Sequence, residues 1–76
     1  MVTDEKWKAR ARGLLKAELS RRNIGYKELA QRLEKLGVPE TEANIANKLS
    51  RGGFSAVFMV QVLDAIECRN LHLGND

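Results

Sequence analysis

Apolar side chains recur three or four positions apart in four segments of the chain, the spacing that gathers them on one face of an α-helix. This pattern predicts helices over residues 4–22, 26–36, 40–50 and 56–67. The fourth segment is apolar around most of its circumference, which is typical of a helix central to a core or buried in part against another subunit. The inward stripes of the other three consist of Trp7, Ala11, Leu14, Leu15 and Leu19 with the acidic Glu18 among them, then Leu29, Ala30, Leu33 and Leu36, then Ile45 and Leu49.

Residues that favour helix ends stand between these segments. Thr3, Thr41 and Ser55 each offer a side-chain oxygen to the first turn of the helix that follows. Asn23 and Gly37 suit the left-handed backbone conformation that often follows a last turn. We therefore expect an all-α fold, a bundle of four to five helices with a short C-terminal tail.

The composition is that of one globular domain, which we place over residues 1–76. Of these residues 43% are hydrophobic and 30% are charged, which excludes a disordered or low-complexity chain. No apolar run reaches the roughly 18–20 residues that span a bilayer, and a start with Asp4 and Glu5 does not resemble a signal peptide. One cysteine permits no internal disulfide, so we expect a soluble protein of the reducing cytoplasm.

Candidate chemistry for an enzyme is scarce. Cys68 and His72 are the only cysteine and histidine, too few for the four ligands of a closed zinc site. No glycine-rich loop is followed by Lys-Ser or Lys-Thr to cradle phosphates, and the carboxylates are scattered singly among basic neighbours. We therefore expect no enzymatic activity, no cofactor and no bound metal.

Charge is distributed unevenly along the chain. Residues 1–36 hold ten basic and five acidic side chains, whereas residues 37–76 hold three basic and five acidic ones, within a net charge of +3. A basic N-terminal half suits an anionic partner, and nucleic acid is the commonest one. A solvated helix surface has the same composition, so charge alone leaves both interpretations open.

The outward face of the third predicted helix carries the residue types that read DNA bases. Ile45 and Leu49 define the core side of this helix. In the major groove, asparagine bonds pairwise to adenine and arginine to guanine. The side opposite the core is therefore a predicted base-reading face, made of Ala43, Asn44, Asn47 and Arg51. Phosphate contacts, which fix the position of a protein on DNA, are predicted for Arg22, Tyr26, Lys27 and Lys48.

The order of the segments is that of a helix-turn-helix protein, in which one helix crosses the DNA backbone and the next enters the major groove. The motifs Lys-Glu-Leu-Ala at 27–30, Leu-Gly-Val at 36–38 and Arg-Gly at 51–52 resemble the skeleton of the Cro/phage-repressor class. The block at 41–56 is similar to a narrower family of small, largely uncharacterised bacterial domains, over about residues 7–73. These resemblances imply a Cro-like helix-turn-helix fold and a repressor-like transcription regulator that binds double-stranded DNA.

The sequence departs from the phage-repressor class around the turn of the motif. Ala30 and Gly37 lie seven residues apart, and the interval from Gly37 to Gly52 is longer than usual. Both helices of the motif are therefore extended, or the turn between them is enlarged. Gly25 and Tyr26 also stand where the class has a polar N-cap and a glutamine.

The apolar fourth segment leaves the nature of the partner open. Either this segment or the tail would join two copies, which doubles the phosphate contacts, so we expect a homodimer on a two-fold-symmetric site. RNA binding is a weaker option, since one Trp and one Tyr provide little surface for stacked bases. The alternative is a protein-interaction or antitoxin-like module, with partner contacts from Phe54, Phe58, Met59 and Val62.

Overall fold

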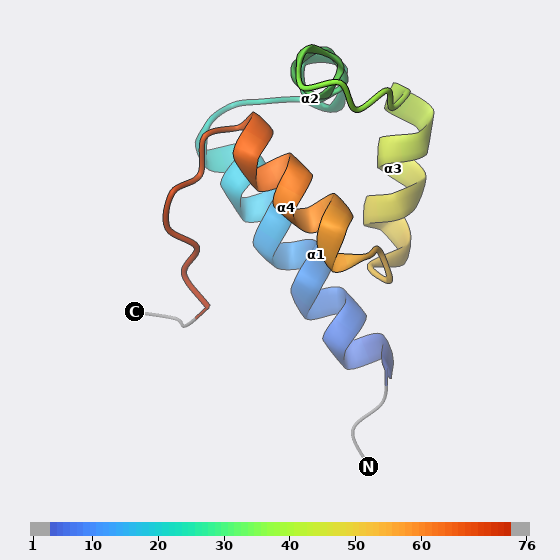
Figure 1. The fold of residues 1–76 in the computed structure, drawn as a ribbon. Coiled ribbons are helices and arrows are strands. Elements are labelled where there is room, and N and C mark those ends of the chain that lie inside the picture. The colour runs from blue at the N-terminus through green and yellow to red at the C-terminus, as the bar shows by residue number, and fades with distance from the viewer. Residues whose placement is uncertain (1–3, 74–76) are drawn as a thin grey trace.

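The computed structural model describes residues 4–73, which form four α-helices and, within that range, no strand (Figure 1). They are α1 (Asp4–Arg21), α2 (Tyr26–Lys35), α3 (Glu42–Arg51) and α4 (Ala56–Ala65). The long helix α1 packs against α3 and α4, and α2 packs against the same two helices. The all-α class is therefore confirmed, with four helices in the described part of the chain.

The start of α3 differs from its prediction because a threonine caps the helix. The first residue of α3 is Glu42, two residues later than predicted, and it follows Thr41 in extended backbone (φ −89°, ψ 159°). The Thr41 Oγ1 accepts a hydrogen bond from the Asn44 N–H at 3.0 Å. The predicted caps Thr41 and Ser55 are confirmed, whereas Thr3 lies outside the described residues.

A left-handed residue follows each of the four helices, and the one after α4 ends that helix earlier than predicted. Asn23 (φ 57°) and Gly37 (φ 81°) follow α1 and α2 as predicted, and Glu67 (φ 59°) follows α4. The helix α4 therefore ends at Ala65, two residues before its predicted end. After Asn23, Gly37 and Glu67, the next backbone N–H bonds at 2.9 Å to a carbonyl near the end of the preceding helix; the donors are Ile24, Val38 and Cys68.

The core lies where the four helices meet, and Trp7 is not part of it. The Trp7 side chain is 55% exposed, although the periodicity of α1 predicts it on the core face. Trp7 lies in the first turn of α1, and the start of this helix extends beyond the other helices (Figure 1). Leu36 is also exposed, because it follows the last turn of α2. The buried apolar residues are Leu15, Leu19, Ile24, Leu29, Leu33, Ile45, Leu49, Phe58, Val62, Ala65 and Ile66.

The helix α4 has one face in the core and a second apolar face that is exposed. Phe58 and Val62 are buried, so these two predicted partner contacts belong to the core. Phe54 and Met59 are half-buried and pack against the same core. The exposed apolar surface, named the valine face below, consists of Ala56, Val57 (66% exposed) and Val60 (63% exposed).

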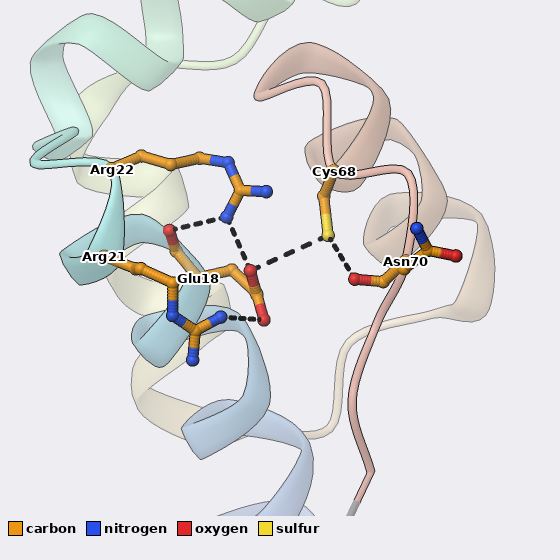
Figure 2. A network of polar contacts seen from close by, with 5 residues as sticks. All are labelled: Glu18, Arg21, Arg22, Cys68 and Asn70. Atoms are coloured by element: carbon orange, nitrogen blue, oxygen red, sulfur yellow. Dashed lines mark hydrogen bonds and ion pairs between the residues drawn. The ribbon is translucent and has the colours of Figure 1, made fainter.

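A buried carboxylate joins the start of the C-terminal tail to α1 (Figure 2). The Glu18 Oε2 accepts a hydrogen bond from Arg21 Nη1 at 2.7 Å, and its Oε1 accepts one from Arg22 Nη1 at 2.5 Å. The thiol of Cys68, just after α4, lies 3.7 Å from the same Oε1 and 3.4 Å from the carbonyl oxygen of Asn70. The hydrogen bond from Arg22 lowers the pKa of Glu18 below its usual value and outweighs burial, which raises it.

Candidate nucleic-acid interface

The side of α3 that faces away from the core collects the predicted base-reading residues. Ile45 and Leu49 are completely buried on the core side and anchor the helix. Small and polar side chains occupy the opposite side, where nothing in the packing of the core restricts them. This exposed surface, named the polar face of α3, is made of Ala43, Asn44, Asn47 and Arg51.

Two backbone carbonyl groups at the C-terminal end of α3 accept hydrogen bonds from residues other than Arg51. The Arg12 Nη1 on α1 donates a hydrogen bond to the carbonyl of Ser50 at 3.0 Å. The Gly52 N–H donates to the carbonyl of Lys48 at 3.1 Å, and Gly52 ends the helix in left-handed backbone (φ 72°). The exposed guanidinium of Arg51 is therefore not required to cap its own helix.

Three of the predicted phosphate contacts lie in different environments. The ammonium of Lys48, beside the polar face of α3, pairs with the Glu40 carboxylate and lies 4.7 Å from the centroid of the Phe58 ring. Lys27 is exposed in the first turn of α2. Tyr26, next to it, is half-buried and packs against the core. Lys27 therefore presents its charge at the surface, the charge of Lys48 is paired with Glu40, and Tyr26 has a structural contact as well.

The fourth predicted phosphate contact, Arg22, is not brought to α3. Its guanidinium donates to the buried Glu18 carboxylate and lies near Cys68 (Figure 2). The end of α1 that precedes Arg22 lies beside the tail, on the opposite side of the molecule from α3 (Figure 1). The spacing of four residues between Glu18 and Arg22 is a sequence signal for this ion pair.

A basic hollow adjoins the polar face of α3 at its C-terminal end. It has a volume of about 480 Å³ and is lined from α1, the last turn of α3, the following loop and α4. Lys8 belongs to it, and the sequence pattern did not single out Lys8 because it lies 43 positions before Arg51 in the chain. The lining residues are Lys8, Lys48, Arg51, Gly53, Phe54, Ser55 and Phe58.

The polar face of α3 and the basic hollow offer hydrogen-bonding groups and positive charge. Within residues 4–73, no three His, Cys, Asp or Glu side chains gather closely enough to hold a metal ion. None of the four helices described is both long and apolar enough to cross a bilayer. The polar face of α3 supplies amide and guanidinium groups, and the basic hollow supplies two ammonium groups beside it.

Comparison with known proteins assigns the chain to a family but not to a function. No curated protein and no solved structure matches the chain. A family model matches residues 7–71, which include α2, α3 and α4, the polar face of α3 and all the residues that line the basic hollow. The chain therefore belongs to the family described as domain of unknown function DUF6471.

Proposed function

We propose that this protein is a small transcription regulator that binds double-stranded DNA sequence-specifically, with the polar face of α3 in the major groove. The observation that carries the proposal is the division of α3 into two sides. Ile45 and Leu49 fix the helix to the core, while the amides of Asn44 and Asn47 are exposed together with Arg51. Amide and guanidinium groups on one exposed helix face are the donors and acceptors that read base edges.

The arrangement of α2 and α3 supports a helix-turn-helix of the Cro type with an enlarged turn. The two helices pack against each other and each has 10 residues. Residues 36–41 connect them, which is longer than the usual turn of three or four residues. In this proposal the longer spacing relative to the phage-repressor class lies in the turn. In this proposal α2 crosses the DNA backbone and Lys27 meets a phosphate there.

A homodimer belongs to the proposal because a single copy offers few phosphate contacts. The net charge of the chain is only +3, and the affinity of nonspecific DNA contacts grows with the number of phosphates neutralised. The valine face leaves two large apolar side chains in water, which is the surface that a second copy would cover. Two copies would place their α3 helices about 34 Å apart, one turn of DNA.

Selection from a randomised DNA pool tests the proposed function. We expect the selection to enrich a palindromic site, and we expect the affinity to fall steeply as the salt concentration rises. Fluorescence-anisotropy titrations then measure the affinity for the enriched site and for random DNA. Asn47→Ala should bind the enriched site about tenfold more weakly, since a bidentate amide contact contributes about 1–3 kcal/mol of discrimination. Its affinity for random DNA should change little.

Gln31→Ala is the matched control, because Gln31 is an exposed amide on α2, a different helix. It should leave both affinities unchanged. Equal binding of the wild type and Asn47→Ala to the enriched site, or the absence of any enrichment, would contradict the assignment of α3 as the reading helix.

Replacement of the valine face tests the dimer. Val57→Ser with Val60→Ser should weaken self-association at least tenfold, because burial of the two side chains contributes roughly 1.5–3 kcal/mol each when complete. Sedimentation equilibrium measures the dimer constant, and circular dichroism checks that the helices are retained. Leu36→Ser, at another exposed apolar position, is the control and should leave the dimer constant unchanged. A wild-type protein that remains monomeric at millimolar concentration would contradict the proposed homodimer.

The same valine face favours a second candidate function, an interaction module for another protein. The partner contacts then come from Val57 and Val60 rather than from Phe58 and Val62, which are core residues. A protein that binds no DNA at low salt and retains a defined partner, lost on the double serine substitution, would favour this second function.

A further inference from the structure

We propose that the basic hollow binds one phosphate group, held by Lys8 and Arg51 at the junction of α1, α3 and α4. In a DNA complex, the bound phosphate would belong to the DNA strand that runs beside α3, and this assignment rests on the function proposed above. The existence of the phosphate site does not rest on that function, because the hollow is built from residues of the protein alone and can be probed with a free anion.

The charge of the hollow is positive and only partly compensated. Among residues 4–73, three cations from two helices line it and no carboxylate does. Glu40 neutralises Lys48, whose side chain it contacts. The contact of Lys8 Nζ with Glu5 Oε2 is 4.0 Å long and the Glu5 side chain is 85% exposed, so water screens the pair and an anion displaces it readily. Lys8 and Arg51 are therefore the cations available to a ligand.

The loop after α3 brings Lys8 to the hollow. Gly52 lies against the backbone of Lys8, so that a Cβ at this position would be 2.3 Å from the Lys8 carbonyl oxygen. At Gly53 a Cβ would lie 3.3 Å from Lys8 Cε and 3.9 Å from its Nζ, so the ammonium stands directly over the loop. This close passage holds the Lys8 backbone against the loop, so its side chain reaches the end of α3, where Arg51 is.

The start of α4 adds to the positive potential. Ser55 lines the hollow and caps α4, its Oγ accepting the Phe58 N–H at 3.0 Å. The first turn of α4 carries no acidic side chain, so the partial positive charge of the helix N-terminus is not neutralised locally. The Phe54 and Phe58 rings form the apolar side of the hollow, with centroids 5.7 Å apart. An apolar wall strengthens the attraction between an anion and the cations opposite it.

The hollow is continuous with the polar face of α3 because Arg51 belongs to both. A DNA strand placed against Asn47 would therefore continue toward Lys8. A phosphate held there would orient α3 in the groove without reading any base, which is the usual role of phosphate contacts.

A titration with inorganic phosphate tests the site without DNA. Amide chemical shifts are followed by NMR at constant ionic strength, with chloride replaced by phosphate. We expect saturable shifts at Gly53 and Ser55, and affinity at least fivefold weaker in Lys8→Gln and in Arg51→Gln. Lys16→Gln is the control, because Lys16 is an exposed lysine of α1 outside the hollow. Shifts that do not saturate, or that persist unchanged in both hollow variants, would overturn the proposal.

The salt dependence of DNA binding tests whether the site binds a phosphate of DNA or a free phosphate compound. Lys8→Gln should reduce the slope of log affinity against log salt by about one, equally for enriched and random DNA. If phosphate saturates the site but the protein binds no DNA, the proposed function fails and the site takes a free phosphate compound. If the protein binds DNA while the phosphate titration is flat and the slope is unchanged, the hollow is not a phosphate site and the proposed function stands.

Discussion

Alanine at position 52 is expected to destabilise the protein by about 3 kcal/mol. Gly52 is buried and has a φ of 72°, a conformation that costs an L-residue roughly 1–2 kcal/mol. A Cβ would also lie 2.3 Å from the Lys8 carbonyl oxygen and 2.8 Å from its carbonyl carbon. These are backbone atoms of the second turn of α1, so α1 and the end of α3 must separate to relieve the contact.

Urea unfolding followed by circular dichroism measures this effect, and Gly53→Ala is its control. At Gly53 the nearest contact of a Cβ is 3.3 Å, to Cε of the flexible Lys8 side chain. That side chain can move, so we expect a loss below about 1 kcal/mol. Equal stability of the two variants would mean that the close passage of the loop over α1 does not hold in solution.

Glu18→Gln is expected to cost about 3 kcal/mol at neutral pH. The Glu18 carboxylate is 4% exposed and accepts hydrogen bonds from Arg21 and Arg22. Glutamine has the same shape but no charge, and its amide hydrogens would face the guanidinium groups. Loss of one partner from a buried ion pair commonly costs about 3–5 kcal/mol, and the partial exposure of both arginines places this case at the lower end.

Acid titration of stability provides an independent measurement of the same group. The pKa of Glu18 is lower in the folded protein than its usual value of 4.5. Its contribution is therefore complete above pH 4.5 and is lost as the pH falls through the lowered pKa. As the pH falls from 5 through the lowered pKa of Glu18, the free energy of unfolding should decrease more for the wild type than for Glu18→Gln. Glu34→Gln, at an exposed glutamate of α2, should behave as the wild type does, and identical acid profiles for all three proteins would contradict this role.

The features that sequence analysis predicts well are those set by neighbours along the chain. Thr41 caps α3 through a contact three residues away, and Gly37 ends α2 through its own backbone conformation. The exposure of Asn47 follows from helical periodicity once Ile45 and Leu49 are buried. Local rules of this kind require no knowledge of how the helices cross.

The features that were missed depend on the crossing of helices distant in sequence. Trp7 fits the apolar stripe of α1, yet it is exposed because α1 is longer than the helices packed on it. Lys8 reaches Gly53 only because α1 passes the loop after α3. Arg22 has a partner at i−4 that sequence alone could indicate, but the burial of that partner depends on the return of the chain at Cys68.

The two-sided construction of α3 also separates what keeps the domain folded from what its surface recognises. Positions 43, 44 and 47 contribute nothing to the buried core, which holds α3 through Ile45 and Leu49. Substitutions at these three positions should therefore leave the buried core intact. Arg51 is less free to vary, because the same side chain lines the basic hollow. Under the proposed function, a change of DNA target would begin at these three positions, whereas a change at Arg51 would also alter the proposed phosphate site.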